Sequence, residues 1–140
     1  EYFLADALQI MIDQGARIEA KSVEVWEDCG TADALLQTNR YILSKDGQTE
    51  RAQFAGEDSI VIPPSYVAPG AVLRNSIVGP YVSIAEGTTV VNSIVKDSII
   101  SERAVIEDSM LQGSLIGSDA HVKGTFERLN VGDLSSIIVG

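Results

Sequence analysis

The sequence of 140 residues is poor in several residue types, and each shortage excludes a class of protein. A single cysteine, Cys29, cannot form a disulfide within the chain. Aromatic residues make up only 6% of a chain that is 45% hydrophobic, which favours short aliphatic strands in small layers over an aromatic-centred core. No basic stretch followed by an apolar run resembles a signal peptide or a membrane span. We therefore expect a cytoplasmic protein that does not bind membranes.

Basic residues are also scarce, because ten Lys and Arg stand against twenty Asp and Glu, for a net charge of −10. Such a charge repels phosphate backbones and anionic lipid surfaces. Nucleic acid is therefore not expected as a partner. The chain opens at Glu1 within an apolar run and without an initiator methionine, so we expect a fragment of a longer protein.

The first part of the chain predicts the order helix, strand, helix. Apolar residues at helical spacing run from Leu4 to Ile12 and stop before Gly15, a typical helix end. Residues 17–26 contain enough alternating β-formers to predict a strand. Thr31 suits the N-cap of a second helix, whose apolar face continues to Leu43.

This order is typical of the end of an α/β domain, which we place at residues 1–43. Residues 44–59 lack a hydrophobic period over most of their length and are predicted to form a linker. A second domain is expected over residues 60–140.

An internal repeat dominates this second domain. The segment 75–78 (Asn-Ser-Ile-Val) recurs at 92–95 and, as Asp-Ser-Met-Leu, at 108–111, so the spacing is 17 and then 16 residues. Within the repeat, large aliphatic residues follow one another at steps of five or six: Ile62, Val67, Leu73, Val78, Ile84, Val90, Val95, Ile100, Ile106, Leu111, Ile116 and Val122. A small residue stands two positions before nearly every one, so strand alternation points both inward. The pattern predicts a narrow prism of about four stacked coils.

The repeat resembles the hexapeptide-repeat family, whose coils wind left-handed. The expected fold class is therefore mainly β, a left-handed parallel β-helix preceded by the helix-strand-helix remnant. After Gly124 the period fades, and residues 125–140 are expected to cap the open end.

The residue just before each large aliphatic should point outward, which sorts these positions onto three faces. The first face is wholly apolar, with Val61, Ile77, Ile94 and Met110. The second carries Tyr66, Ser83, Ile99 and Leu115, and the third carries Val72, Thr89, Val105 and His121. A continuous apolar ladder on a surface marks a contact. We expect the first face to join chains into a homo-oligomer, in first place a trimer, with docking of the preceding domain as the alternative.

The segment 26–31 (Trp-Glu-Asp-Cys-Gly-Thr) resembles a stretch near the end of sugar-1-phosphate nucleotidyltransferase domains. Residues 1–8 and 39–41 match the same family, and the whole chain is similar to the C-terminal part of glucose-1-phosphate thymidylyltransferase-like proteins. The family transfers a nucleotidyl group from an NTP, of dTTP or UTP type, to a sugar 1-phosphate and releases pyrophosphate. The resemblance implies that Asp28 binds Mg²⁺ in the intact parent, where the ion reduces repulsion between the two anionic reactants. It also places the other catalytic residues upstream, so the fragment alone is expected to be inactive.

Simpler roles exist for the same residues. Asp28 also fits a turn before the helix at Thr31, Asp6 fits a helix cap, and Cys29 fits a small buried residue without a neighbouring base.

A different class of function is acyl transfer, because many hexapeptide-repeat proteins use acetyl-CoA to acylate amino sugars. The candidate base is His121, the only histidine of the chain, which also fits an exposed turn. A third possibility is a scaffold that assembles the catalytic domains and binds no substrate itself.

Overall fold

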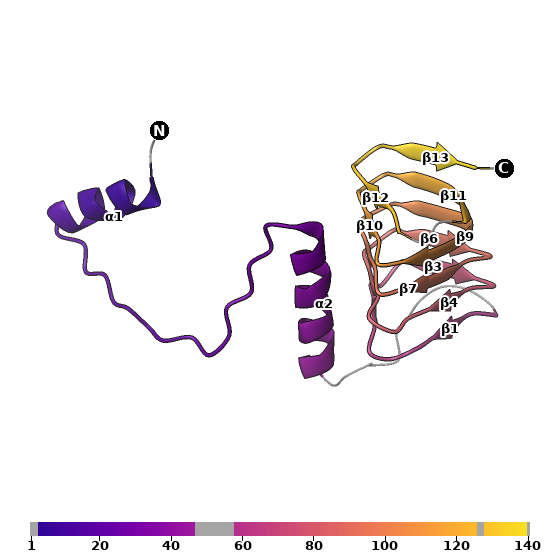
Figure 1. Ribbon diagram of the computed structural model, residues 1–140, viewed down its shortest axis with the longest axis horizontal. Helices are drawn as coiled ribbons and strands as arrows, with labels where there is room; N and C mark the ends of the chain where they lie inside the picture. The colour runs from indigo at the N-terminus through magenta and orange to yellow at the C-terminus, as the bar shows by residue number, and fades with distance from the viewer. Residues whose placement is uncertain (1–2, 47–57, 126–127, 140) are drawn as a thin grey trace.

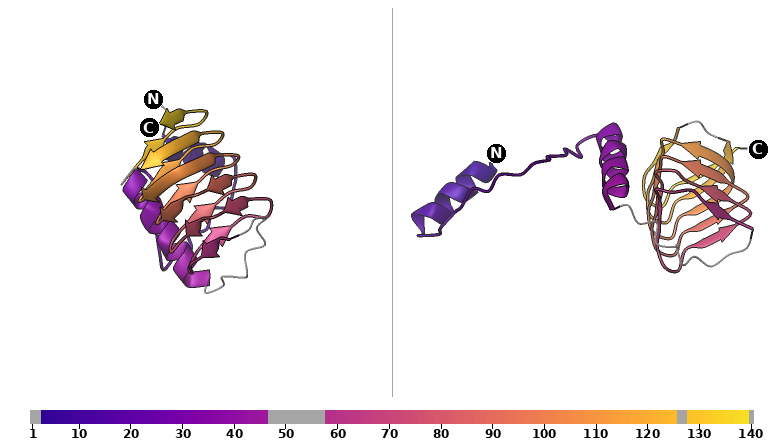
Figure 2. Two further views of the ribbon diagram at one scale, coloured as in Figure 1. Left: turned by 90° about the vertical axis from the view of Figure 1, so that its right-hand side faces the viewer. Right: turned by 90° about the horizontal axis from the view of Figure 1, so that it is seen from below.

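The computed structural model describes residues 3–46, 58–125 and 128–139. Two helices, α1 (Leu4–Asp13) and α2 (Ala32–Asp46), precede a stack of short parallel strands (Figure 1). Figure 1 and the right-hand view of Figure 2 agree that α2 lies against one flank of this stack, whereas α1 lies apart from it. Neither described helix has the length and apolar character needed to cross a bilayer.

Both predicted helices are confirmed. The backbone N–H of Phe3 donates to Asp6 Oδ2 at 3.2 Å, so Asp6 caps α1 as expected, and Gly15 follows its end with a φ of +87°. Thr31 Oγ1 accepts the backbone N–H of Ala34 at 3.2 Å, which is the predicted N-cap of α2. Helix α2 continues to Asp46, beyond the predicted start of the linker at 44. Residues 47–57 of that linker lie outside the described residues.

The strand predicted at residues 17–26 is wrong. The segment contains no strand, and no described strand runs beside it to complete a hydrogen-bond ladder. Its side chains are almost all exposed, and Trp26 retains 83% of its accessible surface. Propensity and alternation alone do not make a strand without a pairing partner.

The stack is a parallel β-helix, as predicted, with about five turns. Its strands are β1 (Ile60–Val61), β2 (Tyr66–Val67), β3 (Val72–Arg74), β4 (Ile77–Val78), β5 (Ser83–Ile84), β6 (Thr89–Val91), β7 (Ile94–Lys96), β8 (Ile99–Ile100), β9 (Val105–Gln112), β10 (Leu115–Ile116), β11 (His121–Thr125), β12 (Asn130–Val131) and β13 (Ser136–Ile138). The turn beyond the predicted four is made by β12 and β13, within the segment expected to be a cap.

Each turn adds one strand to each of three faces. The first face stacks β1, β4, β7 and the second half of β9, and the end of β11 continues it, since Thr125 pairs with Met110. The second face stacks β2, β5, β8, β10 and β12. The third face stacks β3, β6, the first half of β9, β11 and β13.

The register corrects one member of the predicted apolar ladder on the first face. Val61 pairs with the inward Val78 and packs against the core, whereas Ile60 pairs with the outward Ile77. Val61 therefore points inward, and the ladder is Ile60, Ile77, Ile94 and Met110. The prediction is wrong here because Val61 and Ile62 are both aliphatic, and both a step of six from Val61 and a step of five from Ile62 to Val67 fit the spacing of the repeat.

Large aliphatic residues fill the inside of the prism, and the small inward residues link its turns. Ser93 Oγ, for example, donates to the Val91 carbonyl at 2.6 Å and accepts the backbone N–H of Ser109, one turn further on, at 3.1 Å. Ser76 Oγ accepts the N–H of Ser93 in the same way. Among the described residues no buried side-chain oxygen or nitrogen lacks a hydrogen-bond partner. A buried polar atom without a partner would destabilise the prism, and these serines avoid that cost.

The corner between the third and first faces explains why each repeat opens with Asn or Asp. Asn75, Asn92 and Asp108 have φ values of 46°, 49° and 47°, a left-handed conformation that Asn and Asp tolerate better than most residues. Their side chains form a ladder in which Asn75 Nδ2 donates to Asn92 Oδ1 and Asn92 Nδ2 donates to Asp108 Oδ1. The Asn92 amide and the Lys123 ammonium lower the pKa of Asp108, because both stabilise its carboxylate.

Candidate functional site

The second face of the β-helix is covered in part by α2. The helix turns the side chains at positions 32, 36, 39 and 43 to one side, and these are buried or half-buried. Leu36 keeps only 3% of its accessible surface and is the most buried residue of the helix. Since Asn39 on the same stripe contacts the second face, Leu36 is buried against that face. The helix thus packs on the β-helix through a narrow, mostly apolar stripe.

Polar contacts fix the position of α2 along this face. Asn39 uses both ends of its amide: Nδ2 donates to the Tyr81 carbonyl at 3.2 Å, and Oδ1 accepts the Ser83 hydroxyl at 2.6 Å. The Arg40 guanidinium donates to both carboxylate oxygens of Asp97. Such a two-pronged charged pair has a defined geometry, and the hydrogen bond to Asp97 raises the pKa of Arg40.

A third polar contact lies at the other end of the helix, where Arg128 donates to Asp33. The Asp33 side chain is 80% exposed, so this surface pair adds little stability.

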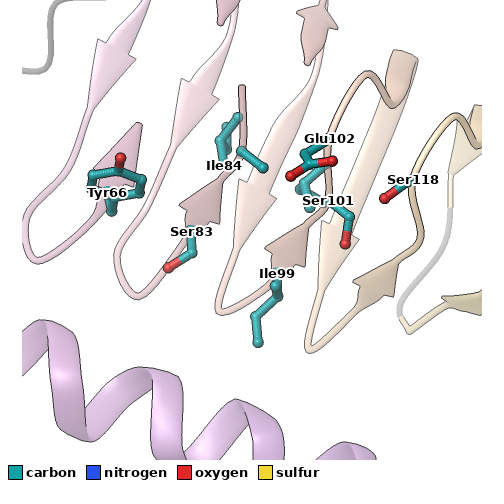
Figure 3. Close-up of a pocket in the computed structure, with 9 residues that line it drawn as sticks. Tyr66, Ser83, Ile84, Ile99, Ser101, Glu102 and Ser118 are labelled. Atoms are coloured by element: carbon teal, nitrogen blue, oxygen red, sulfur yellow. The ribbon is translucent and has the colours of Figure 1, made fainter. Parts of the chain in front are cut away.

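A shallow cavity of about 290 Å³ opens on the second face beside α2 (Figure 3). Its floor includes Tyr66 and Ile99, and Ile99 points toward the helix, while Glu102 and Ser118 stand at the opposite side. Glu102 Oε2 accepts a 3.3 Å hydrogen bond from Arg103, so this carboxylate is already engaged. The cavity therefore combines an apolar floor with a few hydroxyl groups.

The predicted metal ligand Asp28 lies in a turn just before α2. Its Oδ1 accepts the backbone N–H of Gly30 at 3.0 Å, which is the turn geometry considered as its simpler role. The carboxylate is exposed, and no group of three His, Cys, Asp or Glu residues in the described parts of the chain could hold a metal ion. Asp28 alone is one oxygen ligand and not a complete site.

Cys29 beside it is exposed, which corrects the expectation of a buried residue. Its Sγ lies 3.5 Å from Thr38 Oγ1, on the second turn of α2. The expectation failed because the segment that leads to Cys29 packs against no other described part of the chain.

The candidate acyltransferase base His121 is neither in a turn nor fully exposed. It lies on β11, points outward from the third face and is half-buried. Its Nε2 is 2.9 Å from Glu107 Oε2 on the neighbouring turn. Lys123 beside it pairs with Asp108 at 3.0 Å. His121 thus lies beside the Lys123–Asp108 ion pair, in a row of polar side chains on the surface of the β-helix.

Sequence reasoning did not identify Arg40, Asp97 and Ser83 as contact residues. Arg40 and Asp97 are 57 positions apart in the chain, and neither belongs to the inward pattern of the repeat. One available signal was the polar Asn39 between Leu36 and Leu43 on the apolar stripe of the second helix. A polar residue at such a position needs a partner on the surface that the stripe contacts.

Comparison with known proteins agrees with the resemblance of the whole chain to glucose-1-phosphate thymidylyltransferase-like proteins. A glucose-1-phosphate thymidylyltransferase of Streptomyces griseus is 31% identical over 158 aligned positions, which include 96% of this chain and 44% of that protein. A second, from Streptomyces antibioticus, is 26% identical over 87% of the chain and 39% of its own length. No model of a protein family matches the chain. The chain spans less than half the length of these curated relatives, and over nearly all of its own length it is related to proteins named glucose-1-phosphate thymidylyltransferase.

Proposed function

We propose that the chain is the C-terminal oligomerisation and regulatory part of an enzyme that transfers a nucleotidyl group to a sugar 1-phosphate. The donor is an NTP of dTTP or UTP type, and the products are a nucleotide-sugar and pyrophosphate. The observation that carries this proposal is the similarity of 96% of the chain to a glucose-1-phosphate thymidylyltransferase. The exposed apolar side chains of α1 and residues 17–26 support it, because such a surface fits against a preceding catalytic domain.

Asp28 suits Mg²⁺ as one hard oxygen ligand, because its Oδ2 accepts no hydrogen bond from the described residues while Oδ1 accepts the N–H of Gly30. When bound, the ion would offset the negative charge of the reacting phosphates. Its remaining ligands would come from the substrate phosphates and from residues outside this chain. In this arrangement the chain's own contribution is to hold one carboxylate at a fixed place ahead of α2.

The proposed reaction is tested by following pyrophosphate release from dTTP or UTP and glucose 1-phosphate in the presence of Mg²⁺. We expect turnover by the longer protein that carries this segment and none by residues 1–140 alone. Replacement of Asp28 by Asn in the longer protein should lower kcat/KM by at least about tenfold, because a metal ligand is lost. The Glu24→Gln variant removes a nearby exposed carboxylate and should retain activity. Turnover by the isolated chain, or none by the longer protein, would contradict the proposal.

The oligomerisation part of the proposal rests on the first face. Its outward residues over four turns are Ile60, Ile77, Ile94 and Met110, none of them charged, and α2 packs on the second face and leaves this ladder open. Ile60 and Met110 keep 59% and 52% of their accessible surface. An apolar stripe this long on a chain of net charge −10 is a suitable contact between chains, and three such faces meeting at an axis form a closed trimer.

Replacement of Met110 by Lys is expected to dissociate this assembly, because an ammonium group would be buried without a partner. The dissociation constant should rise at least about a hundredfold. Sedimentation velocity measures the change. The Thr89→Lys variant places the same charge on the third face and should leave the mass unchanged. An unchanged sedimentation coefficient for Met110→Lys would show that the first face is not the contact.

A further inference from the structure

We infer that the β-helix positions the Asp28 turn through helix α2, and that Arg40, Asp97, Asn39 and Ser83 are positioning residues for the transfer reaction. This inference rests on the function proposed above. The contacts of α2 with the second face form the α2 clamp. They comprise the Asn39 contacts with Tyr81 and Ser83, the Arg40–Asp97 pair and the buried Leu36.

The α2 clamp holds the helix at a defined height on the β-helix. An apolar stripe by itself allows sliding, because apolar contacts have no direction. Asn39 removes that freedom, since its donor and acceptor ends each meet one partner, at Tyr81 and Ser83. Arg40 adds a second fixed point on the neighbouring turn, where the Asp97 side chain keeps only 19% of its accessible surface. A partly buried, two-pronged pair is more directional than an exposed one.

The N-terminal end of α2 is in turn joined to the Asp28 turn. Thr31 caps the helix by accepting the N–H of Ala34 at 3.2 Å, and Asp28 accepts the N–H of Gly30 at 3.0 Å. Cys29 Sγ, between these two contacts, reaches Thr38 Oγ1 at 3.5 Å on the second turn of the helix. The turn is therefore tied to α2 by side chains as well as by the backbone. Where α2 lies on the β-helix thus determines where the Asp28 carboxylate lies.

Such a connection matters for catalysis because the reaction is sensitive to geometry. A displacement of roughly 1 Å at a reacting group can reduce a rate by about a hundredfold. The β-helix, whose turns are linked by strand ladders and by the serine hydroxyls, provides a stiff surface against which the turn is held.

The clamp itself is tested on the 140-residue chain by amide hydrogen exchange, which requires neither metal nor activity. In the Asp97→Ala variant we expect exchange of the α2 amides to become at least about tenfold faster, because a charged hydrogen-bonded pair is lost. The matched control is Asp119→Ala, which breaks the Arg103–Asp119 pair at 2.7 Å within the β-helix and should leave α2 protected. The Ser83→Ala variant tests the Asn39 contact in the same way. Unchanged exchange of α2 in both clamp variants would refute the inference.

The positioning role is tested in the longer protein by titrating Mg²⁺ at saturating substrates. Asp97→Ala should raise the Mg²⁺ concentration for half-maximal velocity by about tenfold, as expected when a group that orients a metal ligand is removed. Asp119→Ala should leave it unchanged. Exchanging the charges, with Arg40→Asp and Asp97→Arg together, should restore much of the difference.

The two measurements separate the possible failures. Faster α2 exchange with an unchanged Mg²⁺ requirement in an active enzyme would overturn the positioning role. Absence of transfer activity in the unmodified longer protein would overturn the proposed function and the positioning role together, and the clamp would then be judged by exchange alone.

Discussion

Replacement of Gly79 by alanine is expected to lower the free energy of unfolding by about 3 kcal/mol, from overpacking together with backbone strain. Gly79 has a φ of +111°, which residues with a Cβ rarely adopt. A Cβ there would overlap the backbone carbonyl oxygen of Ile62 and lie 2.6 Å from Ser65 Oγ. That hydroxyl donates to the same carbonyl at 2.8 Å and accepts the N–H of Val82, so the clash falls on the link between the first two turns. Urea unfolding followed by far-UV circular dichroism measures the loss.

Gly113 provides the matched control because it lies at the same corner of the prism two turns further on. Its φ is +63°, and a Cβ there would meet no atom within 4 Å. Gly113→Ala should therefore cost only about 1 kcal/mol, the strain of the left-handed conformation alone. Equal losses for the two variants would show that backbone strain, and not the contact with Ile62, makes Gly79 necessary.

The second large effect is expected in the middle of the stack, where Ile100→Ala should destabilise the β-helix by about 3 kcal/mol. Ile100 keeps 1% of its accessible surface, and its strand is paired with Ile84 below and Ile116 above. The Ile100→Ala substitution leaves a cavity. Because the layers of Ile84 and Ile116 pack on both sides of it, the surrounding side chains cannot move in to fill it. In a stack of repeats each turn contacts only its neighbours, so the loss falls on two interfaces at once.

The same truncation in the last turn should be much less costly. Ile137 on β13 is half-buried and has a strand on one side only among the described residues, so Ile137→Ala is expected to cost about 1 kcal/mol. Thermal or urea unfolding of the two variants in parallel makes the comparison. A loss at Ile137 as large as that at Ile100 would contradict the neighbour-only description of the stack.

The β-helix was predictable because its determinants repeat. Asn75, Asn92 and Asp108 recur at one corner, and each is followed by a small and then a large inward residue, so every turn gives the same signal. The error at Val61 arose in the first turn. This turn can be compared with a following repeat but not with a preceding one, and two aliphatic residues are adjacent there. A count of 17 residues back from Val78 would have selected Val61.

The contacts of α2 were not predictable in the same way. The outward positions of the three faces were sorted correctly except at Val61, but no pattern in the repeat indicated that α2 packs on the second face. Arg40 and Asp97 each occur once, so no periodicity connects them. The proposed metal-binding role of Asp28 likewise depends on a resemblance, because its local geometry is that of an ordinary turn.

The length of helix α2 matches the height of the β-helix. Its 15 residues span about 22 Å, and five turns stacked at roughly 4.8 Å cover about 19 Å, so the helix and the stack are nearly equal in length. The helix runs along the stacking direction in Figure 1, with Asn39 at Ser83 in the second turn and Asp33 at Arg128 near the last. In a stack of repeats each turn contacts only its neighbours, so the stack by itself sets no particular number of turns. A repeat inserted between Ser83 and Arg128 would move Arg128 about 4.8 Å away from Asp33, and the helix would no longer match the stack in length.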